Sequence, residues 1–144
     1  MIYEVDPRKL IEVTANELKK MDNIAAPSWA GFVKTGSGKD KSPIREDWWY
    51  VRAAAILRFI HKNGPLGVGK LRVHFGGKAN RGVKPDKFQQ ASGNHIRKIL
   101  QQLEAEKLIK QEQKGSYKGR VTTGKAIILL RKASKNVKAS KEEN

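Results

Sequence analysis

Apolar residues recur at helical spacing along much of the chain, and this recurrence predicts helices separated by loops. The first helix is predicted from Pro7 to Met21, with Asp6 at its N-cap position and the proline in its first turn. The second is predicted over 47–62 and stops at the sequence Asn63-Gly64-Pro65. Because large apolar residues share one side of this second helix, we expect it to be the central helix of the fold.

Three more helical segments are predicted after it. The first, over 68–74, is closed by a pair of glycines, and the last starts at Thr122 or Thr123 and runs to about residue 133. Between them lies a helix capped by Ser92 or Asn94, which has the cleanest periodicity in the sequence. Its apolar stripe consists of Ile96, Ile99, Leu100, Leu103 and Leu108.

Glycine, proline and short alternating segments mark the rest of the chain. Residues 25–43 are predicted to be a loop with at most one short turn, at 27–31. Residues 78–87 are predicted to be a second, glycine-containing loop. Residues 108–113 and 117–122 read as two short strands on either side of a Lys-Gly-Ser turn, which predicts a β-hairpin.

This order of elements is typical of a winged helix-turn-helix. We therefore predict a mainly α fold: a winged helix-turn-helix-like helical domain over 1–133, with one β-hairpin as the wing and an extra N-terminal helix. Residues 134–144 are predicted to be a disordered basic tail, because they are highly charged and Val137 is their one large apolar residue. In such folds the third helix and the wing commonly contact nucleic acid.

The charge of the chain indicates an anionic partner. Thirty Lys and Arg against 14 Asp and Glu give a net charge of +16 over 144 residues, while 38% hydrophobic residues suffice for a modest core. The absence of cysteine excludes disulfides and thiolate chemistry and fits a reducing cytosol. The apolar runs are too short to span a bilayer, and the N-terminus lacks the order of a secretory signal. We expect a soluble, cytoplasmic protein with no membrane partner.

No motif predicts catalysis. Gly64–Lys70 satisfies the pattern G-x-x-x-x-G-K, but Leu71 stands where a phosphate-binding loop needs a hydroxyl, and the segment follows a helix rather than a strand. The spacing of His61, His74 and His95 suits no metal site, and no serine has the spacing of a triad. We expect no catalytic residue, no metal and no cofactor, and thus a protein that is not an enzyme.

Basic and amide side chains gather in three segments that could contact nucleic acid. On the periodic helix, the face opposite the leucines carries Arg97, Lys98 and Gln101, beside Asn94 and Gln102. The loop before that helix carries Lys78, Arg81, Lys84 and Lys87. The hairpin carries Lys110, Lys114, Lys118 and Arg120 around Tyr117. For each group the alternative is an ordinary solvated surface.

Arg52 is the least ordinary residue of the central helix. It projects near the middle of the apolar side, where an unpaired charge is costly, so it needs a partner or an exit to solvent. Either it pairs with an acid such as Glu46 or Asp47, or part of that face is exposed and Arg52 stacks with Trp48 to contact RNA.

Other residues of the same helix have plainer predicted roles. Arg58 and Lys62 lie close together on another face and would add phosphate contacts, whereas Trp49 and Phe59 are expected in the core.

Several stretches of the sequence resemble one known family. Residues 29–36 (WAGFVKTG) and 47–54 (DWWYVRAA) strongly resemble the small-subunit ribosomal protein family S19e of archaea and eukaryotes. Three more stretches agree as well: residues 64–68 (GPLGV), 75–77 (FGG) with 80–82 (NRG), and 96–98 (IRK) continuing to 100–104 (LQQLE). The similarity covers roughly residues 3–133. One departure is visible before the last helix, where Thr122-Thr123-Gly124 is one residue shorter than the family's usual Thr-Pro-x-Gly.

This resemblance implies a structural protein bound to 16S-type ribosomal RNA in the head of the small subunit, among neighbouring small-subunit proteins, and needed for maturation of that subunit. It implies an RNA-facing surface on the central helix, which carries over to Trp48, Arg52, Arg58 and Lys62, and a basic pair at Arg97 and Lys98. Away from the ribosome we expect a monomer. The alternative that fold and charge alone allow is a winged-helix DNA-binding transcription regulator, which would usually be a dimer.

Overall fold

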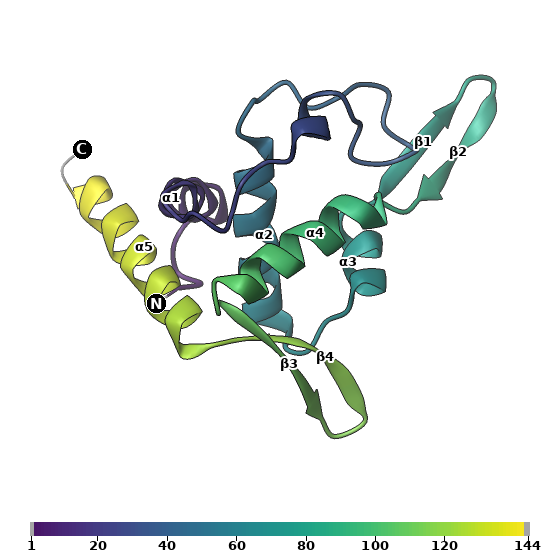
Figure 1. Cartoon of the computed structure of the whole chain (residues 1–144). Helices are drawn as coiled ribbons and strands as arrows, with labels where there is room; N and C mark the ends of the chain where they lie inside the picture. The colour runs from purple at the N-terminus through teal and green to yellow at the C-terminus, as the bar shows by residue number, and fades with distance from the viewer. Residues whose placement is uncertain (1, 143–144) are drawn as a thin grey trace.

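The computed structural model describes residues 2–142, which form helices and two separate two-stranded hairpins (Figure 1). The elements are α1 (Pro7–Lys19), the 3-10 helix η1 (Ser28–Gly31), α2 (Trp48–Asn63), α3 (Val68–His74), β1 (Gly77–Arg81), β2 (Lys84–Gln89), α4 (Gly93–Ala105), β3 (Ile109–Lys114), β4 (Tyr117–Thr122) and α5 (Gly124–Glu142). The prediction of a mainly α, winged-helix-like fold is confirmed.

Helix α2 is the central helix, as expected, and it is buried on more sides than its apolar pattern indicated. At helical spacing Ala54 and Leu57 fall outside the arc that holds Trp49 and Ile56, yet all four residues are fully buried. The reason is that α1, α4, α5 and β4 all pack against α2, so neighbours cover it on several sides and leave one side partly open.

The winged-helix part runs from α2 to β4. Helix α4 buries its predicted stripe against α2 and α3, and β3 and β4 pair in antiparallel register from Ile109↔Thr122 to Lys114↔Tyr117. The backbone of Leu66 exchanges two hydrogen bonds with that of Arg120, at 3.2 and 2.9 Å. These bonds attach the wing to the linker between α2 and α3.

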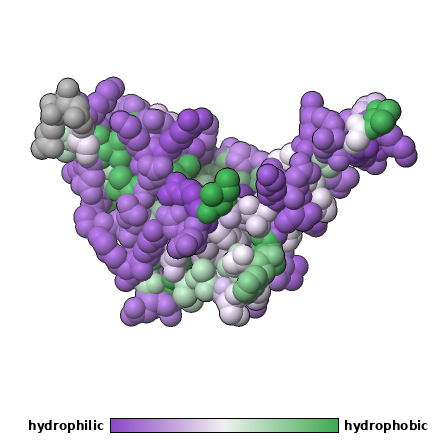
Figure 2. All heavy atoms as spheres, turned by 90° about the horizontal axis from the view of Figure 1, so that it is seen from above, coloured by the Kyte–Doolittle hydropathy of each residue, from purple (hydrophilic) through white to green (hydrophobic). Residues whose placement is uncertain are grey.

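A second hairpin replaces the loop predicted over 78–87, so that prediction is wrong. Strands β1 and β2 pair antiparallel and turn at Gly82 and Val83, where Gly82 has φ +72°. The Asn80 side chain accepts a hydrogen bond from the Gly82 N–H at 2.9 Å, which closes the turn locally. The hairpin projects from the body between α3 and α4, and Figure 2 shows it as an arm set off by a hollow.

The predicted disorder of the C-terminal tail is also wrong, because α5 continues through Glu142. Val137 and Ala133 are buried with Leu130, and this cluster packs on Ile2 and Val5 of the N-terminal segment. The apolar stripe therefore extends past residue 133 while lysines occupy the exposed side. Residues 143–144 of the predicted tail lie outside the described residues.

The helix ends follow the predicted capping residues in part. The Asp6 carboxylate accepts a hydrogen bond from the Arg8 N–H at 3.0 Å, and Ser92 is the N-cap residue of α4. The Thr123 hydroxyl does not cap α5 but donates to the carbonyls of Lys107 and Leu108, at 2.7 and 3.1 Å. Within the described residues, no helix has the length and hydropathy of a bilayer-spanning segment.

Candidate nucleic-acid interface

Five cations lie along one side of α2 and have no acidic partner among the described residues. Two hollows run beside the helix: one of about 500 Å³ beneath the segment 35–45, and one of about 280 Å³ between α1, α2 and α3. Ala55 lines both, so the hollows adjoin. We call the cations that line them, apart from the paired Arg45, the α2 strip: Lys39, Lys41, Arg52, Arg58 and Lys62. Among residues 2–142, no carboxylate forms an ion pair with any of the five.

Arg52 lies half-buried between two rings. Its Cζ is 4.6 Å from the centre of the Phe75 ring, and its Nη1 is 3.5 Å from His95 Nε2. Burial lowers the pKa of the Arg52 guanidinium, which shows that its surroundings disfavour the charge. Both predictions for its partner are corrected: neither Glu46 nor Asp47 pairs with it, and it stacks on Phe75 rather than on the indole at position 48.

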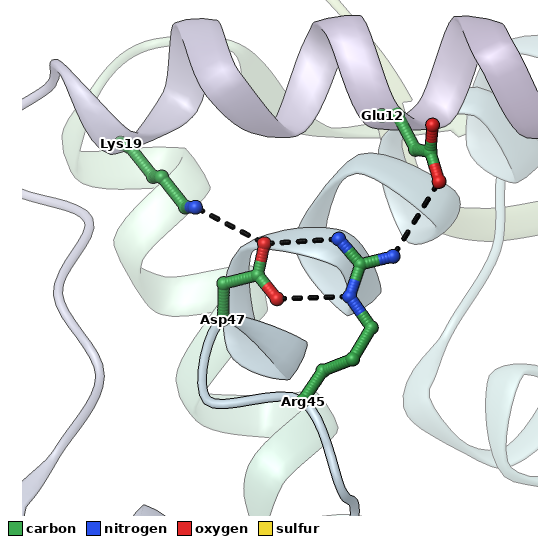
Figure 3. A network of polar contacts seen from close by, with 4 residues as sticks. All are labelled: Glu12, Lys19, Arg45 and Asp47. Atoms are coloured by element: carbon green, nitrogen blue, oxygen red, sulfur yellow. Dashed lines mark hydrogen bonds and ion pairs between the residues drawn. The ribbon is translucent and has the colours of Figure 1, made fainter.

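Asp47 cannot serve Arg52 because it binds two other cations (Figure 3). Arg45 donates to both carboxylate oxygens, at 3.0 and 3.1 Å, and Lys19 donates to one of them at 3.0 Å. These hydrogen bonds, first from Arg45 and then from Lys19, lower the pKa of Asp47 to about 2. Arg45 also reaches Glu12 at 3.5 Å, so the network joins α1 to the start of α2.

Uncharged rings surround the Arg52 guanidinium. Burial first, and the nearby Arg52 charge second, lower the pKa of His95 to about 4, so this buried imidazole is neutral at pH 7. The same two causes lower the pKa of His74, which stacks on Phe59 with ring centres 3.7 Å apart. These rings hold the guanidinium in place without neutralising it, and an incoming phosphate would supply the missing anion.

The lower end of the strip is formed by Arg58 and Lys62. Arg58 Nε is buried and has no hydrogen-bond partner within residues 2–142, while Lys62 is exposed. Both line the smaller hollow with His74. Phe59 was expected in the core. It is only partly buried, and it packs against the core from the side of the smaller hollow.

The β1–β2 hairpin adjoins the upper end of the strip. The Lys39 ammonium lies beside Gly77 at the start of β1, and Gly38 packs against Ala79 and Gln89. The hairpin cations singled out in the sequence are all exposed: Lys78, Arg81, Lys84 and Lys87. The hairpin, which projects from the body as the arm of Figure 2, therefore adds four exposed cations beyond Lys39 of the strip.

The basic face of α4 lies apart from the strip. Arg97, Lys98 and Gln101 are exposed on the side of α4 opposite its buried stripe, and none of them lines either hollow. Gln102, by contrast, accepts a hydrogen bond from Trp49 Nε1 at 2.9 Å and donates to the Ala25 carbonyl, so it fastens α4 to the loop before η1.

Only some of the basic residues predicted on the wing are exposed to solvent. Lys114 and Lys118 are exposed, and Lys70 of α3, which the sequence did not single out, lies 5.3 Å from the centre of the Tyr117 ring. Arg120 instead donates to Glu104 at 2.6 Å and is mostly buried. Its guanidinium holds β4 on α4 and is not available to a phosphate.

Trp48 is likewise committed to packing. Only 9% of its area is exposed, its Nε1 donates to the Ala30 carbonyl at 3.2 Å, and its ring packs edge-on against Trp49 and His95. We therefore leave Trp48 out of the candidate interface, as we do Arg120.

The sequence also missed some residues of the interface. Lys39 and Lys41 come from the segment predicted only as a loop, and Phe75 and His95 support Arg52. The basic, glycine-rich composition of 34–41 was the one available signal. Across the described residues, no three His, Asp or Glu side chains gather as metal ligands.

Comparisons with known proteins agree on one family. The model of the family Ribosomal protein S19e matches residues 1–140. The small ribosomal subunit protein eS19 of Aeropyrum pernix is 46% identical over 108 residues, covering 74% of this chain and 71% of that protein. The protein eS19G of Ascaris suum is 40% identical over 122 residues (85% and 81%), and eS19 of Thermoplasma acidophilum is 38% identical over 128 residues (89% and 83%).

Proposed function

This chain belongs to the ribosomal protein S19e family, and on that premise we propose that it binds small-subunit ribosomal RNA through the α2 strip and the β1–β2 hairpin. The family is one of small-subunit ribosomal proteins and not of enzymes, which places the chain in the small subunit of the cytoplasmic ribosome. The observation that carries the proposal is the row of cations on α2 without acidic partners in the described part of the chain.

The mechanism is binding energy rather than catalysis. Each phosphate that a lysine or arginine neutralises releases condensed counterions, and this release drives association with RNA. Arg52 contributes more than a mobile surface lysine would, because Phe75 and His95 already hold its guanidinium in place. A rigid basic surface of this kind stabilises the packed arrangement of RNA helices.

We further propose the finer assignments that the family resemblance implies. The RNA is of the 16S type and lies in the head of the subunit, the neighbours are other small-subunit proteins, and the protein is needed for subunit assembly and maturation of the precursor RNA. Away from the ribosome the chain is a monomer. Membership of the family replaces the DNA-binding regulator that fold and charge alone allowed.

Replacing Arg52 by methionine tests the proposal. Arg52→Met keeps the stem of the side chain against Phe75 and leaves no acid unpaired, so the thermal midpoint should change little. Affinity for small-subunit ribosomal RNA should fall about tenfold, as for the loss of a hydrogen-bonded charge. The slope of log affinity against log salt should become shallower by roughly 0.7–0.9.

Arg8→Met, at an exposed site on the first turn of α1, is the matched control and should leave affinity and slope unchanged. Unfolding of Arg52→Met would mean that the fold needs the Arg52 guanidinium for its stability. An unchanged affinity and slope would remove Arg52 from the interface.

A further inference from the structure

The β1–β2 hairpin ends in an apolar side chain at a position where hairpin turns are usually polar. Val83 occupies the turn with Gly82, and its exposed fraction is 106%, the highest of the large hydrophobic residues described. Figure 2 shows hydrophobic atoms at the far end of the arm.

The turn that carries Val83 is held in a defined shape. Asn80 Oδ1 accepts the Gly82 N–H, and Arg81 Nε donates across the hairpin to the Pro85 carbonyl at 2.8 Å. Gly82 supplies the positive φ of +72° that the turn requires. Because its neighbours fix the backbone on both sides, Val83 is presented as a rigid apolar point.

The base of the hairpin is anchored to the body. Gly36 bridges to Ala91 directly after β2, and Gly76 lies so close under Phe88 that an added Cβ would be 2.8 Å from its ring. Beyond this base, the residues of β2 from Lys84 to Phe88 are all exposed. An isolated two-stranded hairpin is only marginally stable in water, so contact with a partner would stabilise the strands between this base and the fixed turn.

The charges along the arm indicate the class of that partner. Four cations and one acid, Asp86, occupy the strands and turn: Lys78, Arg81, Lys84 and Lys87 are the cations, and all five are exposed. Four cations around one valine would be desolvated without a counter-charge on an apolar protein surface. RNA, in contrast, offers phosphates on both sides of a groove.

We propose that Val83 is an apolar wedge that enters the minor groove of a ribosomal RNA helix, packing on sugar and base edges, while the flanking cations contact the phosphates on either side. The A-form minor groove is wide and shallow, which suits a two-stranded ribbon presented by its tip. Apolar side chains that enter a minor groove are a known way to combine shape recognition with a charged frame. This inference rests on the proposed function, because it assumes that the chain binds ribosomal RNA.

The first test separates apolar contact from charge. Val83→Ser in the full chain should lower affinity for the small-subunit ribosomal RNA of its own organism about 5- to 20-fold, because a buried aliphatic contact is lost. Its salt slope should stay unchanged, since no cation is removed, whereas Lys87→Ala, at an exposed cation that does not hold the turn, should make the slope shallower by roughly 0.7–0.9. Ile128→Ser, at an aliphatic residue of α5 that is 69% exposed, is the matched control and should bind as the unaltered chain does.

The outcomes distinguish this inference from the proposed function. Unaltered binding by Val83→Ser, with a shallower slope for Lys87→Ala, would overturn the wedge and leave the charged interface in place. Failure of the unaltered chain to bind the RNA would overturn both.

The second test locates the tip. The chain has no cysteine, so Val83→Cys gives a single attachment site for an iron chelate that cleaves nearby RNA, with Ile128→Cys as the control. We expect position 83 to direct cleavage across the minor groove of one RNA helix, at sites that position 128 does not cleave. Position 83 giving no RNA cleavage in assembled subunits, because a neighbouring protein covers it, would overturn the proposal.

Discussion

Arg52 shows how a binding residue can be costly to the free protein. Its guanidinium is half-buried beside Phe75 and His95, and within residues 2–142 no carboxylate offsets the desolvation. A residue selected for stability alone would be apolar or paired at this position. The cost becomes intelligible if a phosphate completes the site, because the charge is then both buried and matched.

His95 makes the stability of the fold depend on pH. Its folded pKa of about 4 lies below the ordinary 6.5, so the unfolded chain takes up the proton first as the pH falls. The contribution of neutral His95 to the stability is therefore fully present above about pH 6.5 and is lost as the pH falls toward 4. Between pH 7.5 and 5 we expect a loss of about 1–2 kcal/mol in the free energy of unfolding, measured by urea denaturation.

The matched variant for this prediction is His95→Gln, which keeps an acceptor for Arg52 but does not titrate. It should show a clearly weaker pH dependence over the same range. His61 and His74, whose pKa values burial also lowers, act in the same direction and account for the dependence that remains. Equal slopes for variant and unaltered chain would show that folding does not lower the pKa of His95.

The burial of a single residue could be predicted from the sequence where helical periodicity alone determines it. Trp49 was predicted in the core and is fully buried. Trp48 was predicted to face RNA, yet Ala30 accepts its indole N–H and η1 covers the ring. Helical spacing assigns a residue to a face, but it does not reveal that a loop 18 residues earlier covers that face.

The wing depends on one glycine for its attachment to the body. An added Cβ at Gly119 would lie 2.7–2.9 Å from the backbone N, C and O atoms of Leu66, and backbone atoms cannot move aside as a flexible side chain can. The Leu66–Arg120 hydrogen bonds next to it would be strained in turn. We expect Gly119→Ala to destabilise the fold by about 1–3 kcal/mol, read from the midpoint of urea unfolding.

The control for this element is Gly69→Ala within α3, where an added Cβ meets no atom within 4 Å. It should stabilise the protein by about 0.5–1 kcal/mol, because alanine loses less conformational entropy in a helix than glycine. A neutral Gly119→Ala would show that the wing can shift away from the α2–α3 linker without cost.

Elements with a strong apolar period were predictable, and elements fixed by distant contacts were not. The periods of α1, α2 and α4 gave helices close to those observed, and the hairpin of β3 and β4 began within one residue of its predicted start. Hairpin β1–β2 has almost no buried face, so no alternation marks it. Residues 134–142 look disordered by composition, but packing of Val137 on the N-terminal segment keeps them helical.

At the scale of the whole molecule, the ion pairs of the described residues do not include the cations of the α2 strip and the hairpin arm. Ion pairs gather where α1 meets α5 and the start of α2, as in Lys132–Glu17, Lys138–Glu4 and Lys19–Asp47. The α2 strip and the hairpin arm lack such pairs among the described residues, and the arm projects on the side of the molecule away from α5. The cations of the strip and the arm thus differ from the ion-paired cations of α1 and the start of α2 in lacking an acidic partner within residues 2–142.

This asymmetry predicts that the position of a charge, and not its number, decides affinity for RNA. Arg58→Gln with Lys62→Gln removes two cations from the strip, and Lys9→Gln with Lys135→Gln removes two exposed cations from α1 and α5. The strip variant should bind small-subunit ribosomal RNA at least about tenfold more weakly. Its salt slope should be shallower by roughly 1.4–1.8, for two lost phosphate contacts.

The variant of α1 and α5 carries the same net charge and should keep nearly the full affinity and slope. Filter binding at four or more salt concentrations measures both quantities for both variants. Because Arg58 Nε has no hydrogen-bond partner, its loss leaves no group unpaired, and the strip variant should remain as stable as the unaltered chain. Equal weakening by the two variants would mean that RNA responds to the total charge of the protein, and the directional surface argued from α2 would then have no role.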